Sequence, residues 1–435
     1  MARKYISFLG TTDYLACTYF LGNREVRNVR FIQEATLELS CREWSAGDRI
    51  LIFTTQEAER INWLDDGHVD RTTGSRLRRE GLKNRIEGIR LSPTLERVLI
   101  PEGRSEDEVW DIFESIFARL DQGDEVVFDI THGFRSIPML AIVVLNYAKA
   151  LKDIKVRGIY YGALEAIGNP QKAASMAVEE RRAPIFDLTA FDSLLDWTIG
   201  VDRFIGGGDA SSICELTEFS LNPILRDTKG QDRAAESLRK AVRELAAFSS
   251  AITTCRATEI GKKAISVARH LNEIGDSRLI KPLEPLLSRI GEHVSCFTGD
   301  PVRDGLAAVR WCVDHNLVQQ GFTVLQETLI TYFVCKGNGD HLNQRHREIA
   351  AQGVHILRKN LIEDEWHDAA RSHPDLTRGF MAAMRQEPDL VNVFETLSGY
   401  RNDLNHAGYR PQPASADMLR IKLREIAERV EGQMN

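Results

Sequence analysis

Cysteine is scarce in this chain, and long apolar runs are absent. The seven cysteines are scattered through 435 residues, and none forms a C-x-x-C pair. This excludes a disulfide framework and gives no zinc-site spacing, so we expect free thiols in a reducing cytoplasm. No stretch approaches the roughly 20 apolar residues needed to cross a bilayer. The run Ile137–Leu145 contains Pro138, and the first apolar segment, which ends at Gly10, is too short for a signal-peptide core. We therefore expect a cytoplasmic protein without membrane contact.

Excess positive charge is also missing. Lys plus Arg total 56 and Asp plus Glu total 63, giving a net charge of −7, so any contact with nucleic acid must be local. A hydrophobic content of 43% and a charged content of 27% exclude the disordered and fibrous classes. The motifs G-x-G-x-x-G, G-x-x-x-x-G-K-[ST] and H-E-x-x-H do not occur, so no dinucleotide fingerprint, P-loop or metal site is predicted.

The first half alternates between short apolar runs and helical patterns, which predicts βαβ units and an α/β Rossmann-like domain with a parallel sheet. The expected strands are Tyr5–Leu9, Arg49–Phe53, Arg97–Ile100, Glu125–Ile130 and Val156–Tyr161. Helical patterns cover Val26–Arg42, Asp107–Leu120 and Ser136–Leu151, and the last is apolar almost throughout, so we expect it to be buried.

The second half predicts helices only. Ile167–Ala183 is polar and mixed, contains Gly168-Asn169-Pro170, and is interpreted as a loop that ends the first domain near residue 185. Further helices are expected at Phe191–Phe204, Arg233–Phe248, Gly261–Ile274, Leu279–Ile290, Asp304–Asp314, Leu317–Cys335, His341–Asn360, Gly379–Arg385, Leu390–His406 and Ala416–Gly432.

One group of candidate residues follows the predicted strands. The segments are Gly10, Thr11, Thr12, Asp13 and Tyr14; then Thr131, His132, Gly133, Phe134, Arg135 and Ser136; and finally Tyr161 and Gly162. The carboxyl ends of parallel strands bind ligands, glycine permits close backbone approach, and free N–H groups, hydroxyls and an arginine favour phosphate. Each segment alone is compatible with an ordinary βα turn. Together they favour a nucleotide or phosphate site.

A second group lies on the predicted helix near the C-terminus. Asn402 and His406 are separated by one helical turn and share a face, and Arg401 stands beside them. An imidazole that titrates near neutral pH and an arginine that stabilises a crowded phosphate can cleave RNA without a metal, because the 2′-OH is an internal nucleophile. The alternative is a solvated polar helix face.

Two further features have simpler interpretations. The basic stretch Arg71–Arg90 contains Glu80 and Glu87, which favours a solvated amphipathic helix. Glu327 stands out on the apolar helix Leu317–Cys335, where we expect it to pair with an arginine of the helical region and rank it only as a possible supporting residue.

The segments Phe8–Tyr14, Thr131–Pro138, Tyr161–Glu165 and Phe186–Thr189 resemble the CRISPR-associated CARF family of Csx-type proteins. Arg401–His406 resembles the R-x4-H motif of HEPN ribonucleases. The resemblance implies a CARF sensor over residues 1–185, a helical linker or insert over 186–300 and a HEPN domain over 301–435.

The resemblance further implies a type III CRISPR antiviral ribonuclease. It would form a homodimer or a larger even-numbered assembly, bind a cyclic oligoadenylate of four or six adenylates as its activator, and use no cofactor. Arg401, His406 and Asn402 would cleave single-stranded RNA without a metal, leaving 2′,3′-cyclic phosphate ends. Two alternatives stay open. One is a non-catalytic nucleotide-sensing regulator that binds a partner through its helical part, and the other is a sensor that degrades its own ligand through Thr12, Thr131 or His132.

Overall fold

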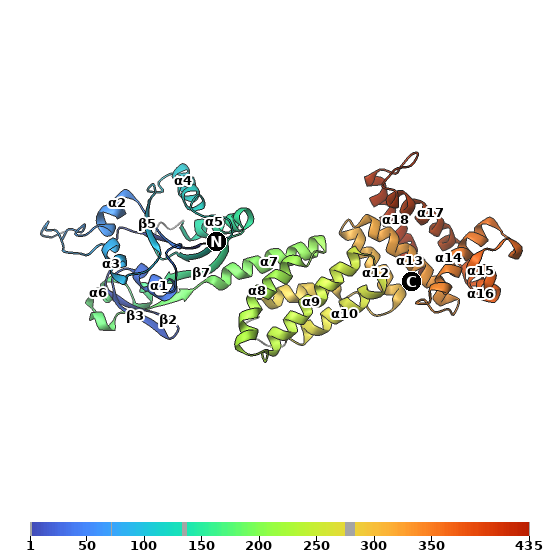
Figure 1. Ribbon diagram of the computed structural model, residues 1–435, viewed down its shortest axis with the longest axis horizontal. Helices are drawn as coiled ribbons and strands as arrows, with labels where there is room; N and C mark the ends of the chain where they lie inside the picture. Colours follow the sequence, from blue (N-terminus) through green and yellow to red (C-terminus); the bar gives the residue numbers. More distant parts are fainter. Residues whose placement is uncertain (1, 71, 133–136, 275–282, 435) are drawn as a thin grey trace. The chain divides into compact units, whose positions relative to one another are not determined.

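The computed structural model of the chain describes residues 2–70, 72–132, 137–274 and 283–434 (Figure 1). These residues divide into two compact units, Met1–Ser193 and Leu194–Asn435. The division falls close to the predicted end of the first domain at residue 185. Each unit is described by itself.

The first unit is built on an eight-stranded sheet with the order β3-β2-β8-β7-β6-β1-β4-β5. The strands are β1 Arg3–Leu9, β2 Cys17–Leu21, β3 Arg24–Val29, β4 Arg49–Thr54, β5 Thr94–Leu99, β6 Glu125–Asp129, β7 Lys155–Gly162 and β8 Arg182–Asp187. Strands β5, β4, β1, β6 and β7 are mutually parallel. Strand β8 is antiparallel to β7, β2 is parallel to β8, and β3 is antiparallel to β2.

Helices cover both faces of this sheet, because successive side chains of a strand point to opposite sides. Ile6 and Phe8 of β1 pack with α4 (Glu106–Phe117) and α5 (Ile137–Lys152). Tyr5 and Leu9 of the same strand pack on the other side with α1 (Ile32–Ser40) and α3 (Leu82–Ile89). The remaining short elements are α2 Gln56–Ala58, the π-helical turn η1 Glu59–Trp63, η2 Leu164–Ile167, α6 Pro170–Ser175 and η3 Val178–Glu180.

All of the strands expected from the sequence are confirmed, and they are mutually parallel as predicted. The additional strands β2, β3 and β8 make the sheet mixed. The helix expected over Val26–Arg42 is in fact the end of β3 followed by α1. Strand β3 is an edge strand with a largely polar sequence, so it lacks the apolar run by which the other strands were predicted. The missed signal is the Gly22-Asn23 turn, where Gly22 has a φ of 58°.

Two other expectations in this unit are corrected. The loop expected over Ile167–Ala183 contains α6 and the beginning of β8. The helix expected over Arg71–Arg90 is limited to α3, since Val69 and Arg76 before it pair in a bridge. Arg71 itself lies outside the described residues.

Helix α5 confirms the predicted helix, but only one of its faces is buried. Ala141, Val144, Leu145 and Ala148 lie in the core. A stripe on the opposite face is exposed although it is apolar, and it comprises Met139, Ile142, Val143, Tyr147 and Leu151. The burial expected for the whole helix is therefore wrong, because the sheet covers only one side of it.

The second unit is helical throughout its described residues. Its helices are α7 Thr189–Gly207, which begins in the first unit, α8 Ser211–Asp227, α9 Arg233–Thr253, α10 Ala257–Asn272, α11 Glu284–Val294, α12 Pro301–Asp314, α13 Val318–Lys336, α14 Gln344–Lys359, α15 Asp368–Ser372, α16 Pro374–Arg385, α17 Pro388–Asn405 and α18 Ala416–Met434, with a short turn η5 at Glu363–Glu365. Apart from α8, which contains Pro223, and the short α15, these helices match the expected ones, although residues 275–282 of the region around Leu279–Ile290 lie outside the described residues.

Helix α13 forms the centre of the second unit and contacts α12, α14, α16, α17 and α18. Apolar side chains are buried on several sides of it, including Phe322, Leu325 and Phe333. The core runs from Trp197 to Val430 and includes residues on both sides of the boundary predicted at 300/301, which stays a prediction. Within the described ranges, no helix has the length and apolarity needed to span a membrane.

Candidate ligand site and candidate active site

The order of the parallel strands places a crevice beside the end of β1. From β1 the chain adds β4 and β5 on one side, and then β6 and β7 on the other. Ligands of open α/β sheets bind at such a switch point, beyond the carboxyl ends of the strands. Strands β1 and β6 pair in register, with Ser7 opposite Asp129. The predicted segments Gly10–Tyr14 and Thr131–Ser136 follow these two strands, so the fold brings their starts together. We call the two segments, with the end of β7, the rim.

The structure does not describe every residue of the rim. Gly133, Phe134, Arg135 and Ser136 lie outside the described residues, so their predicted role in ligand binding stays a prediction.

The buried carboxylate of Asp129 holds the start of the Thr131–Ser136 segment by hydrogen bonds. Asp129 is 0% exposed and accepts hydrogen bonds from Tyr5 Oη and Ser7 Oγ, both at 3.1 Å. It also accepts the backbone N–H of Thr131 at 3.0 Å and the Thr131 hydroxyl at 2.6 Å. Desolvation raises the pKa of this carboxyl, and the hydrogen bonds from Thr131, Ser7 and Tyr5 partly oppose the rise.

The hydroxyl of Thr131 is already used within the protein. Besides donating to Asp129, it accepts the backbone N–H of Gly162 at 2.8 Å. It therefore ties the end of β6 to the end of β7. Gly162 is buried, and a Cβ at this position would come within 2.5 Å of Ile32 Cδ1. The structure thus gives Thr131 and Gly162 a role in holding the two strand ends together.

The Gly10–Tyr14 loop is held by a buried amide. Asn62 donates from Nδ2 to the carbonyl oxygens of Gly10 and Thr12, both at 2.9 Å. Its Oδ1 accepts a hydrogen bond from His68 Nε2 at 2.8 Å. Asn62 is 0% exposed and lies in the π-helical turn η1, a local irregularity that is frequent at functional sites.

Two rings pack together across the rim. The backbone N–H of Gly10 donates to Tyr14 Oη at 3.1 Å, and the ring of Tyr14 lies 4.3 Å from the ring of His132. Burial raises the pKa of Tyr14. Desolvation lowers the pKa of His132 to about 4, so this imidazole is neutral at physiological pH. Tyr14 and His132, predicted from separate segments, are therefore in contact.

Positive charge gathers at the same loop. Asp13 pairs with Arg30 at 3.0 Å and with Arg79 at 3.5 Å. Burial lowers the pKa of His68, and the nearby cations Arg30, Arg79 and Arg60 act in the same direction. Thr11 and Thr12 are exposed beside them. The loop combines free hydroxyls with a local excess of guanidinium groups, which suits an anionic ligand.

Tyr161 stands at the end of β7. Its hydroxyl donates to Glu165 Oε1 at 2.6 Å, and mainly this bond raises the pKa of Tyr161 to about 12. Its ring lies 6.5 Å from the ring of Phe186 and is partly exposed.

Sequence reasoning missed four residues that organise the rim, namely Arg30, Asn62, His68 and Asp129. Only Asp129 gave a signal, as a lone charge inside the apolar run of β6. Arg30 follows the β2–β3 hairpin, Asn62 lies in η1 and His68 lies in the segment after η1, and no local pattern links them to the Gly10–Tyr14 loop.

The predicted catalytic residues lie at the end of α17. Arg401 is half-buried, and its Nη1 donates to Gln326 Oε1 on α13 at 3.3 Å. Its Nε is buried and has no acceptor within the described part of the chain. Gln326 in turn donates from Nε2 to Ser398 Oγ at 3.2 Å. Gln326, which sequence reasoning missed, thus fixes the guanidinium against α13 and leaves it without a carboxylate partner among the described residues.

Asn402 and His406 are exposed, one turn apart, as the helical spacing predicted. The backbone N–H of His406 donates to the carbonyl of Asn402 at 3.0 Å and closes the last turn of α17. Asp403 is 4% exposed and accepts the N–H of Ala414 at 2.8 Å, which anchors the segment that follows His406. Among the described residues no hydrogen bond or ion pair joins Arg401 to His406.

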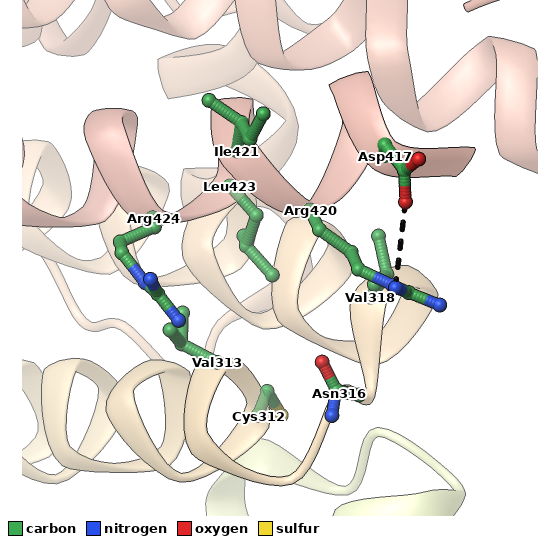
Figure 2. A pocket seen from close by; sticks show the side chains of 9 residues that line it. All are labelled: Cys312, Val313, Asn316, Val318, Asp417, Arg420, Ile421, Leu423 and Arg424. Carbon is green, nitrogen blue, oxygen red and sulfur yellow. Dashed lines mark hydrogen bonds and ion pairs between the residues drawn. The ribbon is translucent and has the colours of Figure 1, made fainter. Parts of the chain in front are cut away.

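Two hollows lie among the described residues of the second unit. The smaller, about 280 Å³, lies between α12 and α18 (Figure 2). Its wall carries Arg424 and Arg420, and the latter pairs with Asp417 at 3.5 Å. The larger, about 550 Å³, is bounded by residues of α10, α12, α13 and α14 and includes Glu327. Glu327 forms the arginine pair expected from the sequence, with Arg347 at 2.7 Å, although it is half-buried.

Comparison with known proteins identifies the first unit. Residues 4–165 match the family described as "CRISPR system endoribonuclease Csx1, CARF domain". The matched range contains β2 to β7, all of β1 except Arg3, and the described residues of the rim. This part of the first unit is therefore similar to the CARF domain of a CRISPR-associated family.

One curated relative extends the comparison beyond this domain. The chain is 27% identical over 235 residues to CRISPR-associated protein MJ1674 of Methanocaldococcus jannaschii. The match covers 53% of this chain and 33% of the relative, so the chain corresponds to about a third of that protein. The matched family range ends well before α17, and the HEPN assignment of residues 301–435 stays a prediction.

Proposed function

We propose that this protein is a cyclic oligoadenylate-activated, metal-independent endoribonuclease that cleaves single-stranded RNA in type III CRISPR antiviral defence. The observation that carries the proposal is the state of Arg401. Its guanidinium is fixed by Gln326, has no carboxylate partner in the described residues, and belongs to the same helix end as the exposed His406. An unpaired, half-buried arginine beside a solvent-accessible imidazole suits a phosphodiester.

The rim suits a cyclic oligoadenylate. Its phosphates would meet Arg30 and Arg79, the exposed hydroxyls of Thr11 and Thr12, and backbone N–H groups. Adenine rings stack on aromatic and imidazole rings, and Tyr14 and His132, whose rings contact each other at a tilt of 35°, would offer such surfaces. Because His132 is neutral, its contribution to binding is stacking rather than charge.

The RNA reaction requires only groups of the protein and the substrate. His406 removes the proton of a ribose 2′-OH, whose oxygen attacks the adjacent phosphorus, and the P–O5′ bond breaks. The leaving 5′-oxygen takes a proton from an imidazolium, either the one just formed or the same histidine of a second copy. Arg401 stabilises the charge on the phosphorane-like transition state, and Asn402 orients the phosphate or the imidazole. The products are a 2′,3′-cyclic phosphate and a 5′-hydroxyl.

The exposed stripe of α5 supports pairing of two copies. Met139, Ile142, Val143, Tyr147 and Leu151 form an apolar face on the helix that directly follows the Thr131–Ser136 segment. Apolar patches of this kind are typical of protein interfaces. Packing this face on the same face of a second copy, about a twofold axis, would place both rims near one symmetric ligand.

An RNA cleavage assay in EDTA, with cyclic tri-, tetra- and hexa-adenylate in parallel, tests the proposal. We expect one of the rings to activate cleavage, and we expect His406→Ala and Arg401→Ala to abolish it without loss of ligand binding. Absence of cleavage with every ring, with or without added metal, would favour the non-catalytic regulator. Disappearance of the ring during incubation would indicate that the sensor degrades its ligand.

A further inference from the structure

The larger cavity of the second unit has the size and composition of a nucleotide site. Its volume of about 550 Å³ lies within the range of roughly 300–1,000 Å³ that is typical of ligand pockets. Its lining is rich in hydroxyl groups, from Thr258, Thr323, Thr328 and Thr331. Hydroxyls both donate and accept, as recognition of a base edge or a ribose requires.

The floor of the cavity is built from closely packed small residues. A Cβ on Gly305 of α12 would lie 2.3 Å from Thr328 Oγ1 of α13, and a Cβ on Gly261 of α10 would lie 1.8 Å from Asp304 Oδ2. These helices therefore approach each other as closely as their backbones allow. The cavity lies beside these closely packed helices, so rigid helices fix its shape.

Arg347 and Glu327 form one wall of the cavity, and hydrogen bonds hold Arg347 in place. Arg347 donates to Glu327 Oε2 at 2.7 Å, to Thr331 Oγ1 at 2.9 Å and to the carbonyl oxygens of His341 and Glu327, both at 3.0 Å. The charges of this pair neutralise each other. Glu327 Oε1 accepts no hydrogen bond within the described residues and is available to the amino or imino group of a base.

The cavity adjoins Arg401. Thr323, Gln326 and Glu327 lie on one face of α13, because they are three and four residues apart. Thr323 and Glu327 line the cavity, and Gln326 holds Arg401. Cys255 also lines the cavity, and Arg401 is close enough to oppose the rise that burial causes in the pKa of its thiol.

Two exposed cations stand at the mouth, Arg256 and Lys262. Lys262 makes a weak surface pair with Glu259 at 3.4 Å. A positive mouth around a hydroxyl-lined interior matches a nucleotide, whose phosphates stay near solvent while its base enters the pocket.

We infer that this cavity binds the base of one nucleotide of the RNA substrate, next to the phosphodiester that Arg401 contacts. The inference rests on the proposed ribonuclease function and adds to it a subsite that selects among bases. Glu327 and the hydroxyls of Thr258 and Thr323 read the base edge, because the hydroxyls of Thr328 and Thr331 already donate to backbone carbonyls. Arg256 and Lys262 hold the adjoining phosphates.

Closing the mouth tests the inference. Thr258 is exposed and lies in the first turn of α10, so Thr258→Trp narrows the cavity with little effect on the core. We expect KM for a short RNA to rise about tenfold with kcat nearly unchanged, which is the signature of lost substrate binding. We also expect the base preference at one position beside the cleaved bond to weaken in a library of random RNA. Thr198→Trp, at another exposed threonine, on α7, that does not line the cavity, is the matched control and should leave both quantities unchanged.

A second measurement needs no variant and no cleavage. Alkylation of Cys255 by iodoacetamide, followed by mass spectrometry of its peptide, should slow severalfold when an oligonucleotide with uncleavable 2′-deoxy linkages is added. If the wild-type protein cleaves RNA while Thr258→Trp keeps the wild-type KM and base profile, and Cys255 is not protected, the inference is overturned and the proposed function stands. If no ring activates cleavage, the proposed function fails, and the protection of Cys255 alone decides whether the cavity binds a nucleotide.

Discussion

Gln326 on α13 accepts a hydrogen bond from Arg401 on α17 at 3.3 Å while donating to Ser398. The bond joins a nearly buried amide to a guanidinium whose Nε has no acceptor in the described residues. The amide therefore fixes the position of the arginine without neutralising its charge.

This relationship predicts losses of different size for two changes of Gln326. Gln326→Glu introduces a carboxylate that pairs with Arg401, so we expect kcat for RNA cleavage to fall by roughly two orders of magnitude, as for loss of one charge-stabilising group. Gln326→Ala removes the positioning bond but keeps the charge free, and we expect a fall of only about tenfold. Single-turnover kinetics with saturating ring measures both. Equal losses in the two variants, or a change in KM alone, would contradict a positioning role.

The hydrogen bonds of Asp129 predict that the first unit loses stability when this carboxylate is removed. Asp129→Ala leaves the donors of Tyr5, Ser7 and Thr131 without their acceptor, at a cost of about 1–3 kcal/mol in unfolding free energy. Denaturant unfolding measures the loss, and hydrogen exchange should show reduced protection of the Gly162 amide, which Thr131 accepts. Asp129→Asn, which keeps one acceptor, should lose less. Unchanged protection of Gly162 in the Ala variant would show that Thr131 is held by other contacts.

The pKa of His132 predicts a pH dependence with a definite sign. Its folded-state pKa is lowered from the ordinary value of 6.5 to about 4, so the unfolded chain takes up the proton first as the pH falls. The contribution of His132 to stability is therefore complete above about pH 6.5 and is lost as the pH falls toward 4.

Proton NMR of the imidazole resonances checks this directly. We expect one resonance, missing in His132→Asn, to titrate near pH 4. A midpoint at or above pH 6 would mean that the ring is solvated and not enclosed against Tyr14.

The exposed stripe of α5 predicts that the protein self-associates through its first unit. Ile142→Glu places a charge in the middle of the stripe and should shift the protein toward the monomer in light scattering coupled to size exclusion. The expected loss of ring-activated cleavage follows if the active site needs two copies. Leu99→Glu, which charges another exposed apolar residue of the same unit, should keep the wild-type mass. A wild-type protein that is already monomeric would contradict the pairing.

The hydrogen bonds of Asn62 to the Gly10–Tyr14 loop predict an effect on ligand affinity. Asn62→Ala removes both hydrogen bonds to the carbonyls of Gly10 and Thr12, so the loop loses its anchor. We expect affinity for the activating ring, measured by calorimetry, to fall about tenfold, as for the loss of one or two supporting hydrogen bonds. Asn84→Ala, which removes an exposed bond to Asp65, is the control and should bind normally.

The sequence was sufficient for the parallel strands because each is a short apolar run between helical patterns, as in β1 and β6. It was insufficient for β8, whose pairing with β2 joins residues far apart in the chain, such as Thr18 and Arg182. It was also insufficient for the β2–β3 hairpin, because β3 has a largely polar sequence. Placement of the Gly10 and Thr131 segments at adjacent strand ends followed from parallel topology. The supports of these segments did not, because Asn62 reaches Gly10 only through the folded loop of η1. Burial of α5 was overestimated because apolar composition does not distinguish a core face from an interface.

The double engagement of Thr131 has a kinetic consequence. A hydroxyl that donates to Asp129 and accepts from Gly162 has no spare rotamer, so this part of the rim is already in one conformation before any ligand arrives. Association with the ligand then needs no slow reordering of these strand ends. Discrimination between cyclic oligoadenylates of different size depends instead on the residues that can still move, which are the exposed threonines and the guanidinium groups around Asp13.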